Sequence, residues 1–139
     1  MTPTEIALSH YTLPFKLKPY QVEVVDDLGP LDEEGHYLDP GTGKTACSTV
    51  IALFRKIYYQ ERCVVIMPPI LLKQWETWLR SIKPCPSVIK YAGTPAERKA
   101  MSLYADFVLV GIQIFKKEYI RFEEFFKDFF DRNPQENRP

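Results

Sequence analysis

A glycine-rich segment, Pro40-Gly41-Thr42-Gly43-Lys44-Thr45, constrains the fold of this chain more than any other part of its sequence. Its two glycines allow a tight backbone turn, and a lysine and a threonine follow directly. The short apolar run His36–Leu38 precedes the segment, and apolar residues at helical spacing follow it from Lys44 to Tyr59. A strand, a glycine-rich turn and a helix, in this order, form the context that a phosphate-binding loop requires. The sequence therefore predicts an α/β domain with a nucleotide site at this turn.

Each part of this turn has a chemical role in holding a triphosphate. Gly41 and Gly43 let the backbone approach the phosphates, Lys44 would reach the outer phosphates, and Thr45 would ligate Mg²⁺. The predicted ATP-binding residues of the turn are Pro40, Gly41, Thr42, Gly43, Lys44, Thr45 and Ala46. Leu38 stands where the general motif has its first glycine, so a glycine turn that only caps a helix is the alternative. That alternative does not explain why lysine and threonine stand together after the glycines.

Strands and helices alternate along the rest of the chain, which is typical of a mostly parallel sheet flanked by helices. Two continuous apolar runs, Cys63–Met67 and Phe107–Val110, predict buried strands, and we expect the first to be buried on both faces. The other expected elements are helices from Lys18 to Leu28, from about Ile70 to Ile82 and from Pro95 to Leu103, a weaker strand from Ser87 to Tyr91, and an aromatic helical stripe from Ile112 to Phe130. We interpret the aromatic stripe as core or interface surface.

Length and composition favour one intracellular domain. The chain has 139 residues, of which 45% are hydrophobic, and its 18 basic residues balance 18 acidic ones. A contact with nucleic acid would therefore need a local patch of charge. Three cysteines and two histidines fit neither a disulfide framework nor a zinc site. No apolar run has the length of a signal-peptide core or a membrane span, so we expect a cytoplasmic protein without a membrane partner.

Two segments resemble motifs of the Snf-type branch of superfamily-two helicases, which includes chromatin remodellers and related bacterial and phage translocases. Leu17-Lys18-Pro19-Tyr20-Gln21 is similar to the leading Leu-Arg-Pro-Tyr-Gln of that branch, in which the glutamine recognises adenine. Leu38–Thr45 is similar to its phosphate loop, where an acidic residue often precedes the glycines. The resemblance implies that Gln21 joins the ATP site. Taken alone, Gln21 is equally compatible with an ordinary exposed helix residue.

Three further segments fall where this family has parts that face nucleic acid. Val64–Trp75 has the strand, the proline turn and the Gln-Trp pair, and Lys90–Thr94 and Asp106–Gln113 follow in the family's order. The last segment lacks the usual Thr-Ser/Thr-Tyr pattern. Ligands of open α/β sheets gather at the carboxyl ends of the strands. The predicted nucleic-acid-binding residues are Pro68, Lys73, Gln74, Trp75, Gly93, Thr94, Gly111 and Lys116, although a tryptophan such as Trp75 is also an ordinary core residue.

The resemblance implies a partial RecA-like domain, with an N-terminal extension at residues 1–16, the N-terminal portion of a helicase ATP-binding domain at 17–130 and a polar tail at 131–139. Our leading hypothesis is the N-terminal part of an ATP-dependent helicase or translocase that uses ATP and Mg²⁺ and contacts nucleic acid, with DNA favoured, independently of sequence. If a phage encodes it, the location would be the host cytoplasm. No apolar strand here ends in Asp-Glu. We therefore expect hydrolysis to require downstream motifs and a second RecA-like domain, and no catalytic residue beyond Lys44 and Thr45.

Two other classes of protein remain open at this point. One is a short interaction protein, derived from a helicase, that binds a partner or blocks DNA without turnover. The other is a different phosphate-loop enzyme such as a small kinase. A kinase would not need Gln21 or the Gln74-Trp75 pair at these positions.

Overall fold

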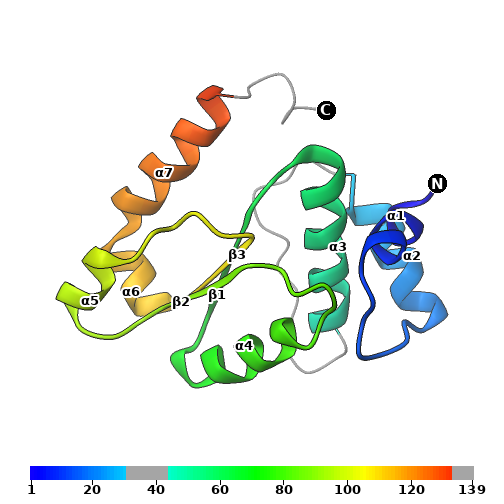
Figure 1. Cartoon of the computed structure of the whole chain (residues 1–139), viewed down its shortest axis with the longest axis horizontal. Coiled ribbons are helices and arrows are strands. Elements are labelled where there is room, and N and C mark those ends of the chain that lie inside the picture. Colours follow the sequence, from blue (N-terminus) through cyan, green and yellow to red (C-terminus); the bar gives the residue numbers. More distant parts are fainter. Residues whose placement is uncertain (31–43, 133–139) are drawn as a thin grey trace. The chain divides into compact units, whose positions relative to one another are not determined.

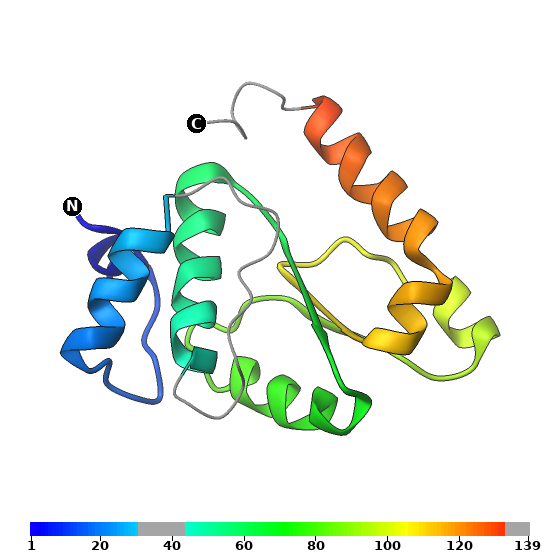
Figure 2. The ribbon, with the colours of Figure 1, turned by 180° about the vertical axis from the view of Figure 1, so that it is seen from behind.

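The computed structural model of the chain describes residues 1–30 and 44–132, with side chains for all of these except 44–45 and 126–132. The expected strand at His36–Leu38 and most of the glycine-rich turn lie outside the described residues. The chain divides into two compact units, one formed by Met1–Glu61 and Ile82–Pro84, the other by Arg62–Ser81 and Cys85–Pro134. Figure 1 and Figure 2 show the elements of both units from opposite sides.

The first unit is built from three helices, α1 (Pro3–His10), α2 (Pro19–Leu28) and α3 (Lys44–Tyr59). Helix α1 packs against both of the others, and α2 packs along α3. The hydroxyl and the backbone N–H of Thr4 in α1 both donate to Asp26 of α2, at 2.8 and 3.0 Å. The ranges of α2 and α3 confirm the two helices that apolar spacing predicts here.

Helix α1 has no counterpart among the expected elements, although its sequence contains a start signal. Thr2 caps the helix by accepting a hydrogen bond from the backbone N–H of Glu5, and the Glu5 carboxylate accepts one from the backbone of Thr2. Pro3 occupies the first turn, where its missing N–H costs nothing. Thr-Pro-x-Glu is therefore a capping box that identifies a helix start before any apolar period is visible.

The second unit contains a three-stranded parallel sheet in the order β1-β3-β2. The strands are β1 (Cys63–Met67), β2 (Val88–Tyr91) and β3 (Phe107–Gly111). All five residues of the central strand β3 are buried, as its apolar sequence predicts. Strand β1 has only one neighbour among the described strands, and Ile66 is 41% exposed. The expectation that β1 is buried on both faces is therefore wrong within the described part of the chain.

Helices cover both faces of this sheet. The connections are a 3-10 turn η1 (Pro69–Leu71) with helix α4 (Leu72–Arg80), then α5 (Pro95–Ala100), and finally α6 (Ile112–Lys117) with α7 (Tyr119–Arg132). Helix α4 lies on one side of the strands and α5 to α7 lie on the other (Figure 1, Figure 2). Right-handed crossovers require this alternation when the third strand inserts between the first two. The fold is thus α/β with a parallel sheet flanked by helices, as expected of part of a RecA-like domain.

The aromatic stripe contributes to the core of this second unit. Phe122 of α7 is 2% exposed and contacts Tyr91 of β2 edge to face, with ring centroids 5.2 Å apart. Phe115 and Phe125 pack against the same cluster, which also contains Val108. The interpretation of the stripe as core is therefore confirmed for Phe115, Phe122 and Phe125. Tyr119 is 51% exposed, and the side chains of 126–130 lie outside the described residues.

Candidate nucleotide and nucleic-acid sites

Gln21 lies beside the beginning of α3, the helix into which the glycine-rich turn leads. The backbone carbonyl of Gln21 accepts a hydrogen bond from the thiol of Cys47, with 3.9 Å between sulfur and oxygen. Gln21 is buried, and its side-chain oxygen accepts from the backbone N–H of Lys18 at 2.8 Å. Because Cys47 is only three residues beyond Lys44, the fold brings two candidate ATP-binding segments together across 26 positions of sequence.

Only the last residues of the predicted phosphate loop lie within the described part of the chain. Lys44 and Thr45 form the first two positions of α3, and Ala46, the next residue, is buried. The predicted residues Pro40 to Gly43 lie outside the described residues, as do the side chains of Lys44 and Thr45. The helix predicted to follow the turn is present as α3.

A buried arginine, which sequence reasoning did not single out, fixes α2 against α3. The Arg55 side chain donates from Nε and Nη2 to both carboxylate oxygens of Glu61, at 2.5 and 2.8 Å, and from Nη1 to the backbone oxygen of Gly29 at 2.6 Å. Its guanidinium also lies over the ring of Tyr59. Gly29 directly follows α2, so Arg55 holds the far end of the helix that begins near Gln21.

The carboxyl ends of the three strands form one edge of the sheet in the second unit. Met67 of β1 pairs with Gly111 of β3, and Tyr91 of β2 pairs with Val110. Seven of the eight predicted nucleic-acid-binding residues lie in the segments that follow these strands, and the eighth, Gly111, is the last residue of β3. The parallel register therefore brings these segments to one edge, as the sequence predicts.

The segment after β1 presents polar side chains to solvent. Pro68 directly follows the strand and begins the turn η1, and Lys73 and Gln74 lie in the first turn of α4. All three are exposed, whereas Trp75 is half-buried. The Lys73 ammonium forms no ion pair within the described residues.

The segment after β2 has a conformation that requires glycine. Gly93 has φ +103°, a region that L side chains rarely adopt. Thr94 then caps α5: its hydroxyl accepts from the N–H of Glu97, and the Glu97 carboxylate accepts from the N–H of Thr94, each at 3.2 Å. These hydrogen bonds hold the pKa of Glu97 below its ordinary value. The hydroxyl of Thr94 therefore has a structural role at this helix start.

The end of β3 lies against the segment after β1. A Cβ placed on Gly111 would lie 3.1 Å from Cγ of Pro69, so glycine permits a close approach here. Gly111 also caps α6, on which Lys116 is exposed. Gln113 and Lys117 are exposed on the same short helix.

A polar network between α5 and the α6–α7 junction was not expected from the sequence. Glu118 accepts hydrogen bonds from the Tyr91 hydroxyl at 2.5 Å and from Nε of Arg98 at 2.6 Å. Arg121 donates to the same Tyr91 hydroxyl at 2.7 Å and to the backbone oxygen of Met101 at 2.6 Å. Burial raises the pKa of the Glu118 carboxyl, but the hydrogen bonds and nearby arginines outweigh that effect and leave it below its ordinary value.

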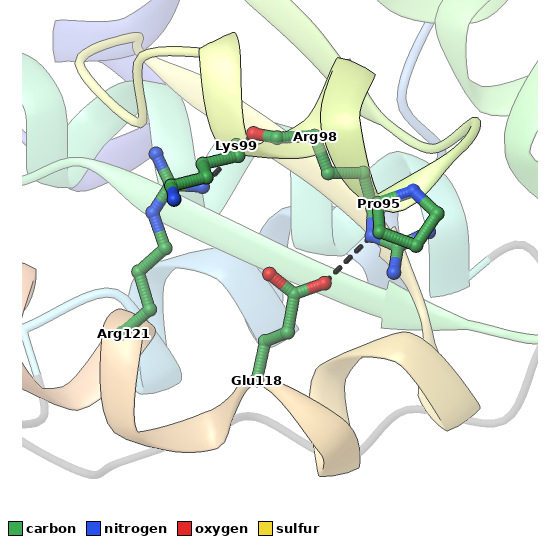
Figure 3. A pocket seen from close by; sticks show the side chains of 5 residues that line it. All are labelled: Pro95, Arg98, Lys99, Glu118 and Arg121. Carbon is green, nitrogen blue, oxygen red and sulfur yellow. Dashed lines mark hydrogen bonds and ion pairs between the residues drawn. The ribbon is translucent and has the colours of Figure 1, made fainter.

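An open pocket of about 560 Å³ adjoins this network. Its lining residues, drawn in Figure 3, are Pro95, Arg98, Lys99, Glu118 and Arg121. Glu118 reaches from the α6–α7 junction toward α5, where it meets Arg98 (Figure 3). Three cationic side chains and one carboxylate give this pocket a net positive charge.

Within 1–30 and 44–132, no helix has both the length and the apolar character needed to span a membrane. In the same part of the chain, no three His, Cys, Asp or Glu side chains gather closely enough to hold a metal ion.

Comparisons with known proteins show the class of fold. No family model and no curated protein matches this chain. Among solved structures it is similar to a chain of the Sulfolobus solfataricus SWI2/SNF2 ATPase core in complex with double-stranded DNA, with a TM-score of 0.60 and 22% sequence identity. The similarity covers 75% of this chain and 23% of that one. At this level of identity the likeness shows a shared fold, and this chain spans less than a quarter of the similar protein.

Proposed function

We propose that this chain is the N-terminal part of the first RecA-like domain of an ATP-dependent nucleic-acid translocase of the Snf type. Residues Pro40–Ala46 bind the phosphates of ATP, with Thr45 as a ligand of Mg²⁺, and Gln21 contributes to binding the adenine. The edge formed by the segments after β1, β2 and β3 contacts the sugar-phosphate backbone, with DNA as the favoured polymer.

The observation that carries the nucleotide proposal is the hydrogen bond between Cys47 and the backbone of Gln21. It joins the start of α2 to the first turn of α3, and the two resembling motifs lie at these two places. The similarity in fold to a SWI2/SNF2 ATPase core in complex with double-stranded DNA supports the same proposal.

Nucleic-acid binding is proposed for the sheet edge because of its chemistry as well as its position. Lys73 and Lys116 are exposed near two strand ends that lie in contact through Pro69 and Gly111. Lysines hold backbone phosphates as point charges and do not read bases. The chain has no net charge, so this local pair of cations would provide a weak, sequence-independent interaction.

Calorimetry with ATP and Mg²⁺ tests the nucleotide site. We expect the wild-type chain to bind, and Lys44→Ala to bind at least about tenfold more weakly, because the outer phosphates lose their principal cation. The matched control is Lys16→Ala, which removes the same charge from an exposed position outside both motifs. Equal affinity of the wild type and Lys44→Ala would contradict the proposal.

A further inference from the structure

We infer that the pocket between α5 and the α6–α7 junction binds a backbone phosphate of a nucleic-acid strand, through Arg98, Lys99 and Arg121. This inference rests on the nucleic-acid binding proposed above and adds a contact that the resembling motifs do not include. The pocket lies in the second unit, beyond the loop that follows β2.

The charge of the lining favours an anion. Three cations face one carboxylate, and that carboxylate is already held by Tyr91 and Arg98. Lys99 is exposed and makes no hydrogen bond or ion pair within the described part of the chain. Glu97, the acidic side chain of α5, accepts a hydrogen bond from the backbone N–H of Thr94 and does not line the pocket.

The Arg98 guanidinium is held in place by two hydrogen bonds and retains N–H groups that can donate to a ligand. Its Nε is bonded to Glu118 and its Nη1 to the backbone oxygen of Gly93, at 2.6 Å each. No hydrogen bond involves its Nη2 among the described residues, so this nitrogen can still donate to an incoming oxygen. Because the guanidinium is already ordered, a phosphate would bind it with little additional loss of side-chain entropy.

The position of the pocket suits a strand that follows the sheet edge. Arg98 bonds to Gly93 itself, the glycine that the resemblance assigns to a segment facing nucleic acid. Arg121 is held on the other side by Tyr91, the last residue of β2. The pocket therefore adjoins the proposed edge and would hold a further phosphate of the same strand.

The test is a nuclear magnetic resonance titration of the full chain at constant ionic strength, with amide shifts as the readout. One arm adds a short oligothymidylate without terminal phosphates, and the other adds inorganic phosphate. We expect the oligonucleotide to shift the amides of Ala96–Lys99 and Glu118–Arg121. Lys99→Ala should weaken this effect roughly threefold or more, while the matched control Lys117→Ala, on exposed α6, should leave it unchanged.

Three outcomes would overturn the inference. The oligonucleotide could bind without shifting these amides, or it could shift them equally in Lys99→Ala and wild type. The third outcome is that inorganic phosphate shifts these amides and the oligonucleotide does not. The amides of Lys73 and Gln74 report separately on the proposed sheet edge. If they shift while those of Ala96–Lys99 do not, the pocket assignment fails and the proposed function stands. Failure of Lys44→Ala to affect ATP binding concerns the nucleotide site only.

Discussion

Gly111 lies so close to Pro69 that a Cβ on the glycine would stand 3.1 Å from Cγ of the proline ring. Gly111 is the last residue of β3 and Pro69 lies in the turn after β1, so their contact joins the ends of these two strands. Gly111 has φ −70°, so a normal side chain is compatible with its backbone. The neighbouring proline ring, and not the local turn, therefore favours glycine at this position.

Replacing this glycine gives the first prediction. Gly111→Ala should destabilise the chain by about 1 kcal/mol, because the added methyl group overpacks a contact that can relax only by moving the proline turn. Urea denaturation followed by far-ultraviolet circular dichroism measures the change. Gln113→Ala, at an exposed position of α6, is the control and should change stability by no more than about 0.5 kcal/mol. Equal stability of the two variants would mean that the ring has room to move.

Arg55 supports the second prediction, because its planar guanidinium bonds Glu61 and Gly29 at the same time. Arg55→Lys keeps the charge but cannot make these bonds together, so we expect a loss of about 1–3 kcal/mol in the free energy of unfolding. Arg80→Lys is the matched control: Arg80 is 52% exposed and pairs with Glu76 at 3.5 Å. A surface pair of this kind contributes little. A similar small loss in both variants would show that the Arg55 contacts do not stabilise α2 against α3.

Strands β1 and β3 of the second unit were predictable because their apolar runs are continuous. Phe107–Gly111 is the central strand of the sheet and all of its residues are buried, as its apolar sequence predicts. The partial exposure of β1 could not be predicted in the same way, because apolar content does not tell which strand has a single neighbour among the described strands. The alternation of strands and helices was enough to predict a parallel α/β fold.

The ends of several helices could not be predicted from apolar spacing, because they depend on tertiary contacts. The helix expected to reach Leu103 ends at Ala100, because Leu103 is buried in the core and the backbone becomes extended at Met101 to reach it. The expected helix from Ile70 begins with the 3-10 turn η1, and α4 ends at Arg80. The aromatic stripe breaks at Glu118, whose partners Arg98 and Tyr91 are 20 and 27 residues away.

The candidate site was predictable in the parts that local motifs define. The Lys-Thr pair at the start of α3 and the residues after each strand follow from strand, turn and helix order. The network of Arg98, Glu118 and Arg121 was not predictable, since each is an ordinary charged helix residue until the fold brings them together. Long-range pairing of this kind has no periodic signal in a single sequence.

Glu118 provides a prediction about pH. Its folded pKa lies below the ordinary value of 4.5, so its contribution to stability is present above that value and is lost as the pH falls through the lower, folded pKa. Glu118→Gln should therefore reduce stability by about 1 kcal/mol at neutral pH, and the difference from wild type should shrink below pH 4.5. Urea denaturation at a series of pH values measures this. A difference that stays constant down to low pH would exclude a role for the charged carboxylate.

The last prediction concerns binding to nucleic acid at the sheet edge. Labelled single- and double-stranded DNA should bind weakly and without sequence preference, and the logarithm of the affinity should fall against the logarithm of salt concentration with a slope of magnitude about two to four. Each neutralised phosphate contributes slightly less than one to this slope, so the value counts a few contacts. Fluorescence anisotropy at several salt concentrations measures it.

Two exposed lysines should account for about half of that slope. The double variant Lys73→Ala with Lys116→Ala should lower its magnitude by roughly one to two and weaken low-salt binding. The double variant Lys16→Ala with Lys83→Ala removes the same charge from exposed positions of the first unit and is the control. A general effect of charge would change both variants alike, whereas phosphate contacts at the sheet edge would change only the first. Strong low-salt binding that survives in the first variant would show that DNA contacts another surface.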